Sequence, residues 1–161
     1  MDLNQLATTL LDRLGKLGLT VATAESCTGG NIAHHITLIP GSSSAMLGGV
    51  VSYHNSVKER VLNVNPADIE QYGAVSRAVV EQMALGVKAL TGADLTLATS
   101  GIAGPGGGTS DKPVGTVWMA VASPLGVVSE VVRFDGSRSE VIEATTGHVI
   151  TMALRQLELI K

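Results

Sequence analysis

The 161-residue sequence predicts an α/β protein, a single domain over residues 1–161 built as a three-layer sandwich with a mixed β-sheet and helices on both faces. Two observations support this fold class. In the first ninety residues, short apolar runs alternate with segments of helical periodicity, a pattern typical of parallel strands. After residue 94, strand-length runs follow one another, and the turn sequence "SPLG" joins the last two as a hairpin, which adds antiparallel pairing.

The N-terminal part predicts two strands among several helices. Leucines recur at helical spacing over residues 3 to 17, and Gly18 is a natural helix stop. The remaining elements expected here are a buried strand at 19–24, a helix from Thr28 to about Leu38, a strand at 46–54, two short helices of which the second is capped by Asn65 with Pro66 behind it, and a helix from Ser76 to Leu90.

The C-terminal part predicts the rest of the sheet and a closing helix. Strands are expected at 94–99, 115–122 and 127–134, and Ser137 with Glu140 forms a capping box that begins the last helix. Between the first two strands, the segment 100–114 holds five glycines and two prolines. Because so long a loop in a compact domain is usually functional or disordered, and this one directly follows a strand, we expect it to be functional.

Composition excludes several classes of function. The net charge of −3 and the absence of any basic cluster argue against a nucleic-acid partner, and an aromatic content of 2% leaves few rings to stack on a base. No apolar run approaches the ~18 residues of a membrane span, and the N-terminus does not read as a signal peptide. A single cysteine, Cys27, excludes an internal disulfide and fits a reducing compartment, so we expect a cytoplasmic protein with no membrane association.

The stretch "TAESCTGG" places a serine, Ser26, on a turn from a strand into a helix. The first N–H groups of that helix have no partner within it, so they can bind an anion or stabilise a forming oxyanion. Gly29 and Gly30 allow another chain or a substrate to approach closely. The competing interpretation is that Ser26 or Thr28 only caps the helix, and the hydrolase motif G-x-S-x-G is absent.

A serine nucleophile needs a base, and the four histidines have no acidic partner at a recognisable spacing. Lys58 can take this role if burial lowers its pKa, with Tyr53 passing or positioning a proton, although a lysine is more often a solvated surface charge. Cys27 is a rival nucleophile, but we favour a small buried residue at that position. One cysteine provides no zinc motif, and neither a metal nor a cofactor is expected.

The glycine-rich loop does not match the known phosphate-binding motifs. A P-loop needs lysine where this chain has Gly107, and G-x-G-x-x-G is not met. Successive small residues can still form a nest of N–H groups for a phosphate, and Arg138 at a helix start can add a bidentate contact.

Six segments in order, "AESCTGG", "GVVSYHNSVKERVLNV", "GAVS", "SGIAGPGGG", "KPVGTVW" and "FDGSR", give the chain a resemblance to the CinA C-terminal domain family over about residues 3 to 158. Stand-alone members of that family include nicotinamide-nucleotide amidases. The resemblance implies an α/β sandwich that hydrolyses the carboxamide of nicotinamide mononucleotide to nicotinate mononucleotide and ammonia. It also implies a homodimer, since members often form dimers.

The resemblance further implies Ser26 as nucleophile, Lys58 as base and Tyr53 as an assisting residue. Both glycine-rich loops would line the site, and the substrate-binding residues expected on this basis are Cys27, Thr28, Gly29, Gly30, Ser100, Gly101, Gly104, Gly106, Thr109 and Arg138. The chain departs from the family pattern at Asn31, Asn63 and Gly106, the last of which often is acidic in relatives.

Two other functions remain open at this stage. A non-catalytic nucleotide-binding module could act in competence or DNA-damage responses through protein partners. A phosphotransfer enzyme ranks last, because it would need a P-loop lysine and metal-binding carboxylates, and Asp111 is the only acidic residue in the loop.

Overall fold

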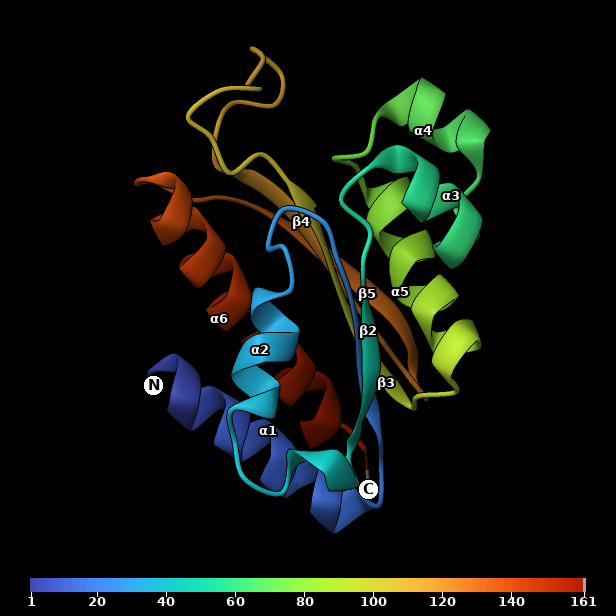
Figure 1. The fold of residues 1–161 in the computed structure, drawn as a ribbon, viewed down its shortest axis with the longest axis vertical. Coiled ribbons are helices and arrows are strands. Elements are labelled where there is room, and N and C mark those ends of the chain that lie inside the picture. The colour runs from blue at the N-terminus through green and yellow to red at the C-terminus, as the bar shows by residue number, and fades with distance from the viewer. Residues whose placement is uncertain (161) are drawn as a thin grey trace.

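The computed structural model describes residues 1–160 and contains one five-stranded sheet in the order β2-β1-β3-β4-β5 (Figure 1). The strands are β1 (Val21–Glu25), β2 (Met46–Val51), β3 (Leu95–Gly101), β4 (Thr116–Ser123) and β5 (Gly126–Arg133). β1 pairs in parallel with both β2 and β3, whereas β4 is antiparallel to β3 and to β5. The predicted mixed sheet and the C-terminal hairpin are confirmed.

Helices cover both faces of the sheet, which confirms the three-layer sandwich. Their bounds are α1 (Leu3–Leu17), α2 (Asn31–Thr37), α3 (Asn55–Leu62), α4 (Pro66–Tyr72), α5 (Arg77–Thr91) and α6 (Arg138–Glu158), with a short 3₁₀ turn, η1, at Ser42–Ser44. In Figure 1, α1, α2 and α6 lie on one side of the sheet and α3, α4 and α5 on the other. The capping box predicted at Ser137 and Glu140 does begin α6.

The two faces of the sheet carry side chains of different size. Towards α1, α2 and α6 the strands present bulky residues such as Leu97, Met119 and Val121. Towards α5 they present mainly alanines, Ala22, Ala24, Ala98, Ala120 and Ala122. Small side chains let α5 lie close to the sheet, and Thr96 on β3 donates a hydrogen bond to the Ala84 carbonyl of α5 at 2.8 Å.

Helix α2 begins at Asn31 and not at Thr28 as the sequence predicted. The helix starts later because of the backbone at Gly29 and Gly30. Their φ angles are 60° and 101°, in the left-handed region that a right-handed helix cannot include. Residues 26–30 therefore form a separate turn between β1 and α2.

The carboxyl ends of the three parallel strands meet at one end of the sheet, the upper end in Figure 1. β2 ends at Val51, three residues earlier than predicted, and the next residue remains attached to β1 because Ser52 donates its N–H to the Glu25 carbonyl at 2.7 Å. The turn that carries Ser26, the start of α3 and the glycine-rich loop all leave the sheet at this end, which is where open α/β sheets usually hold their sites.

Candidate functional site

Ser26 and Lys58 are in direct contact. Lys58 Nζ lies 2.8 Å from Ser26 Oγ, and both residues are buried. Ser26 comes from the turn after β1, whereas Lys58 is the fourth residue of α3, a helix that the His54 side chain caps by accepting the Ser56 N–H. The two elements are neighbours because β2, which precedes α3, pairs with β1.

The Lys58 amino group has three hydrogen-bond partners. Besides Ser26 Oγ, it contacts the Ser52 carbonyl at 2.7 Å and the Tyr53 carbonyl at 3.3 Å. Only 1% of Lys58 is exposed, and burial lowers its pKa from the ordinary 10.5 to about 8. The lysine is thus buried beside a hydroxyl with no carboxylate bound to it among the described residues.

Glu25, the last residue of β1, is the main residue of this region that our sequence reasoning missed. Its carboxylate accepts hydrogen bonds from Thr28 Oγ at 2.6 Å and from the N–H groups of Ile32 at 2.9 Å and Ala33 at 3.0 Å. The N–H groups at the start of α2, which we expected to be free for an oxyanion, are therefore occupied. The signal available in the sequence was an acidic residue at the end of a buried strand, followed by two glycines just before a helix.

Other N–H groups of the turn are free. Within residues 1–160, no other residue places an acceptor in hydrogen-bond geometry with the N–H of Cys27, Thr28 or Gly30, although Gly29 donates to the Ser26 carbonyl at 3.0 Å. Cys27 and Thr28 are the next two residues after Ser26 in the chain. The turn can thus still provide oxyanion donors, but from the nucleophile's own turn and not from the helix behind it.

Cys27 is buried beside Ser26, and burial raises the pKa of its thiol to about 12. A thiol with such a pKa carries almost no thiolate at neutral pH, and the thiolate is the reactive form. The structure therefore favours our interpretation of Cys27 as a small buried residue over the rival interpretation as a nucleophile.

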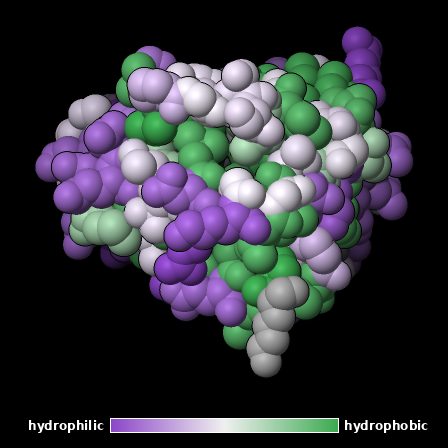
Figure 2. All heavy atoms as spheres, turned by 90° about the horizontal axis from the view of Figure 1, so that it is seen from below, coloured by the Kyte–Doolittle hydropathy of each residue, from purple (hydrophilic) through white to green (hydrophobic). Residues whose placement is uncertain are grey.

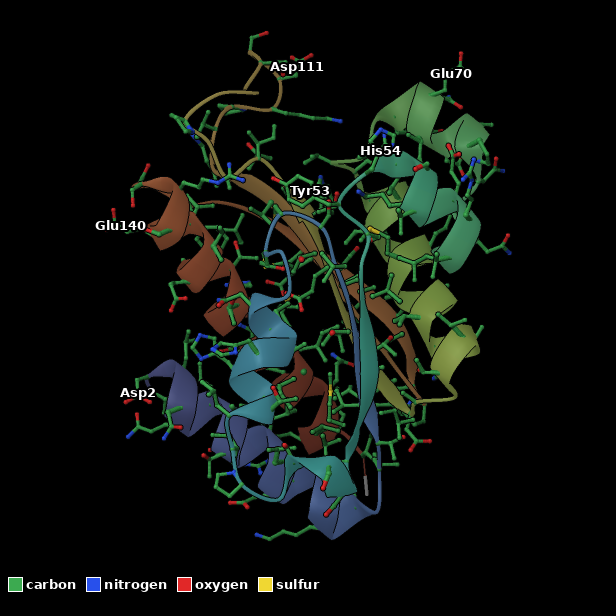
Figure 3. The ribbon with its side chains drawn as sticks, viewed as in Figure 1. Asp2, Tyr53, His54, Glu70, Asp111 and Glu140 are labelled. Carbon is green, nitrogen blue, oxygen red and sulfur yellow. The ribbon has the colours of Figure 1, made fainter. Side chains whose placement is uncertain are left out.

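Tyr53 and Arg138 form a second contact, next to the first. The Arg138 guanidinium, in the first turn of α6, donates to Tyr53 Oη at 2.8 Å and to the Gly104 carbonyl at 2.6 Å. The Tyr53 side chain is largely exposed, and Figure 3 shows it between the start of α6 and the start of α3. Tyr53 therefore meets Lys58 through its carbonyl, while its hydroxyl meets Arg138.

The remaining predicted residues are spread along the glycine-rich loop. Ser100 is buried and donates to the Ala74 carbonyl at 2.8 Å, whereas Gly106 is exposed, and exposed Thr109 bonds only to Lys112 within the loop. Gly101 and Gly104 serve packing, because an added Cβ would lie 2.6 Å from Val117 Cγ2 and 2.4 Å from Val114 Cγ1, respectively. No hydrogen bond in the described part of the chain joins these five residues to Ser26 or Lys58.

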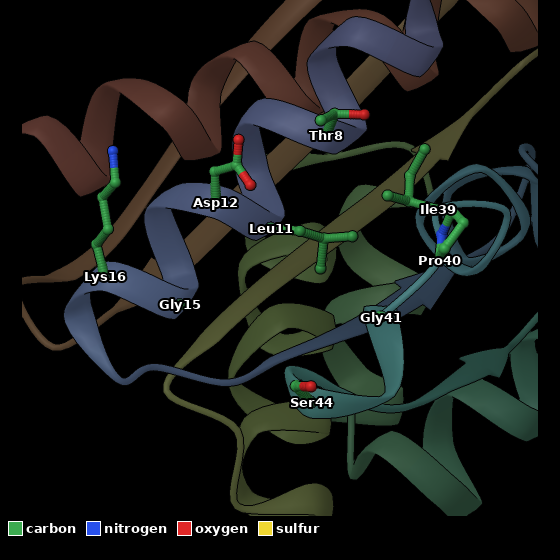
Figure 4. Close-up of a pocket in the computed structure, with 9 residues that line it drawn as sticks. All are labelled: Thr8, Leu11, Asp12, Gly15, Lys16, Ile39, Pro40, Gly41 and Ser44. Atoms are coloured by element: carbon green, nitrogen blue, oxygen red, sulfur yellow. The ribbon is translucent and has the colours of Figure 1, made fainter.

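A separate hollow of the surface lies away from these residues. It is an open groove of about 480 Å³ between α1 and the segment that joins α2 to η1, lined by Leu11, Asp12, Lys16 and Ile39 among others (Figure 4). The end of the molecule opposite Ser26 shows apolar and polar side chains intermixed (Figure 2), with Leu90, Leu125 and Leu159 exposed. In the groove, the hydroxyls of Thr8 and Ser44 make no hydrogen bond to Asp12 or Lys16 among the described residues.

Two further findings concern the described residues as a whole. Within residues 1–160, no group of three or more His, Cys, Asp or Glu side chains is placed to hold a metal ion. No helix in this range, not even the 21-residue α6, combines the length and apolar character needed to cross a membrane.

Known proteins resemble this chain closely. A CinA-like protein of Desulfotalea psychrophila is 51% identical over 144 residues, which are 89% of this chain and 35% of the relative. A relative in Shewanella oneidensis named nicotinamide-nucleotide amidohydrolase PncC is 47% identical over 144 residues, 89% of this chain and 34% of its own. The chain thus spans about a third of the length of the curated relatives it matches.

Solved structures share the whole fold. The competence/damage inducible protein CihA of Agrobacterium tumefaciens superimposes with a TM-score of 0.94 at 41% identity, over 98% of this chain and 96% of its own. The competence damage-inducible protein A of Klebsiella pneumoniae gives a TM-score of 0.97 at 31% identity over the full length of both chains. The family model of the CinA C-terminal domain matches residues 3–157. With this match over nearly its whole length, the chain belongs to the CinA C-terminal domain family.

Proposed function

We propose that this protein is a nicotinamide-nucleotide amidase, which hydrolyses the carboxamide of nicotinamide mononucleotide with Ser26 as nucleophile and Lys58 as base. The observation that carries the proposal is the 2.8 Å contact between Lys58 Nζ and Ser26 Oγ in a buried setting that lowers the pKa of the lysine to about 8. The amidohydrolase name of the 47% identical relative supports the choice of substrate.

The hydrogen bonds of Lys58 suit a general base. A neutral amine has two N–H donors and one lone pair, and it has three partners here. The carbonyls of Ser52 and Tyr53 can only accept, so they take the two N–H groups. The lone pair then faces Ser26 Oγ, where it can accept the hydroxyl proton.

Acylation follows from this arrangement. As Ser26 Oγ attacks the carboxamide carbon, its proton passes to Lys58 and negative charge develops on the carboxamide oxygen. The free N–H groups of Cys27 and Thr28 are the donors that stabilise this oxyanion. When the C–N bond breaks, the Lys58 ammonium returns its proton to the nitrogen, which leaves as ammonia, and Ser26 holds an acyl ester.

Deacylation uses the same groups in reverse order. A water molecule attacks the ester carbon while Lys58 takes one of its protons, and the second oxyanion meets the same N–H donors. Collapse of that intermediate returns the proton to Ser26 Oγ and releases nicotinate mononucleotide. No metal or cofactor takes part in either half of this scheme.

Substrate recognition involves the phosphate. Arg138 offers a guanidinium fork beside the site, and Tyr53 and Gly104 orient it. In this proposal Tyr53 assists through two groups: its carbonyl holds Lys58 and its hydroxyl holds Arg138. Small residues of the loop from Gly101 to Thr109 surround the rest of the nucleotide.

The test is ammonia release from nicotinamide mononucleotide by the purified protein in the presence of a chelator, beside Ser26→Ala and the control Ser43→Ala. Ser43 is exposed in the η1 turn, away from the site. We expect release by the wild type and the control and none by Ser26→Ala. Turnover by Ser26→Ala would exclude serine catalysis, and tight binding of the nucleotide without turnover by the wild type would favour a non-catalytic nucleotide-binding module.

A further inference from the structure

We propose that Glu25 is a positioning residue, whose buried carboxylate fixes the turn that carries the nucleophile and the oxyanion donors. The inference rests on the proposed amidase function and concerns a residue to which that mechanism gives no chemical step. Glu25 is 1% exposed, and none of the ion pairs within residues 1–160 involves it. A carboxylate buried without a cation needs hydrogen-bond donors to offset the loss of water.

Those donors come from both sides of the turn. Thr28 Oγ belongs to the turn itself, whereas the N–H groups of Ile32 and Ala33 belong to α2. All three groups donate, so the carboxylate acts only as an acceptor. Glu25 thus supplies the helix cap that Gly30, with no side chain, does not provide.

The hydrogen bonds of Thr28 also connect Glu25 to the neighbouring strand β3. A threonine hydroxyl has a single proton, and that of Thr28 goes to Glu25 at 2.6 Å. In the 2.9 Å contact between Thr28 Oγ and Thr99 Oγ, Thr99 must therefore be the donor. The chain of donors runs from Thr99 on β3 through Thr28 to Glu25, and it is entirely buried.

This network holds a short piece of chain at both ends. At one end, Glu25 is in the sheet, where its carbonyl accepts the Ser52 N–H. At the other end, the Thr28 side chain is bound back to Glu25 and Thr99. The three residues from Ser26 to Thr28 contain the nucleophile and both oxyanion donors of the proposed mechanism, so their geometry depends on the Glu25 carboxylate.

The main test is Glu25→Gln, which keeps the shape but replaces one acceptor oxygen with an NH₂ that cannot accept from its present donors. We expect kcat to fall by about 30-fold or more with KM within twofold, because the loss falls on the transition state and not on nucleotide binding. The pH midpoint should stay near 8, since Lys58 stays buried with the same three hydrogen-bond partners. A fluorophosphonate that labels Ser26 should react more slowly in proportion to kcat.

A second pair of variants keeps the proposal testable if Glu25→Gln does not fold. Thr28→Val removes the bridging hydroxyl and should lower kcat about tenfold or more, whereas Thr28→Ser keeps the hydroxyl and should restore it. Wild-type kcat in Glu25→Gln or Thr28→Val, or a change in KM alone, would overturn the role of Glu25. A wild type that neither turns over the nucleotide nor reacts with the fluorophosphonate would overturn the amidase function, and the role of Glu25 with it.

Discussion

At the scale of single residues, burial acts on two neighbouring side chains in opposite senses. It lowers the pKa of Lys58 to about 8 and raises the pKa of Cys27 to about 12, because in each case it disfavours the charged form. A neutral lysine is a base, whereas a neutral thiol is a weak nucleophile. In the proposed mechanism, the same buried environment therefore activates Lys58 as a base and keeps the adjacent cysteine unreactive.

The activity should rise with pH as Lys58 loses its proton. Only the neutral amine can accept the Ser26 proton, and with a pKa of about 8 roughly a tenth of the lysine is neutral at pH 7. We expect kcat/KM for nicotinamide mononucleotide to increase about tenfold per pH unit below 7 and to level off above 9. Initial-rate measurements of ammonia release from pH 6 to pH 10 check this, and a flat profile would contradict the role of Lys58 as base.

The lowered pKa of Lys58 also has a consequence for stability. The unfolded chain, where the lysine pKa is ordinary, binds more protons than the folded chain between pH 8 and pH 10.5. The free energy of unfolding of the wild type should therefore rise relative to that of Lys58→Met by about 2 to 3 kcal/mol between pH 7 and pH 10. Denaturant unfolding of both proteins at the two pH values measures the difference, and a difference independent of pH would mean that the folded lysine keeps its ordinary pKa.

At the scale of elements, the sequence was most informative about the strands and least informative about how a turn is held. Apolar runs and turn residues were enough to predict all five strands, the hairpin and the caps at Asn65 and Ser137, because these depend on local patterns. The role of Glu25 was not predictable in this way. It depends on the left-handed glycines that bring N–H groups seven and eight residues later back to the carboxylate.

The placement of Lys58 depends on how closely α3 approaches α5. A Cβ added at Gly86 of α5 would lie 2.0 Å from the Leu62 carbonyl at the end of α3. Gly86→Ala should therefore push α3 outward, lowering the free energy of unfolding by about 1 to 3 kcal/mol and reducing kcat by displacing Lys58. The matched control is Gly15→Ala in α1, where an added Cβ has nothing within 4 Å and should stabilise the protein by up to about 1 kcal/mol. Equal effects of the two variants on thermal unfolding would show that the close approach of the helices does not matter.

At the scale of the whole molecule, the site draws on both helical layers and on the sheet between them. Ser26 follows the interior strand β1, and Lys58 comes from α3 on one face of the sheet. Arg138 comes from α6 on the other face, and it reaches Tyr53, 85 residues away in the sequence. Motif spacing could suggest each residue separately, but the contact between Tyr53 and Arg138 depends on the order of the strands and on which face each helix covers.

Arg138 joins α6 to Tyr53 and to the loop at Gly104. We therefore expect the helical layer that contains α6 to contribute to substrate binding through this residue. Arg138→Gln removes the guanidinium and, with it, the charged hydrogen bonds to the substrate phosphate. We expect this loss to raise KM for nicotinamide mononucleotide by about 10- to 100-fold. Tyr53→Phe removes only a group that orients the arginine, so we expect a smaller rise.

The control for this prediction lies on the same helix. Arg155 bonds to Glu130 of β5 at 3.0 Å, and Arg155→Gln should leave KM unchanged. Steady-state kinetics with nicotinamide mononucleotide and with nicotinamide riboside, which lacks the phosphate, separate the possible roles of Arg138. If the arginine binds the phosphate, Arg138→Gln weakens only the reaction of the nucleotide. If both substrates are weakened alike, Arg138 acts by holding the loop and Tyr53 in place, and the phosphate must be bound by other groups.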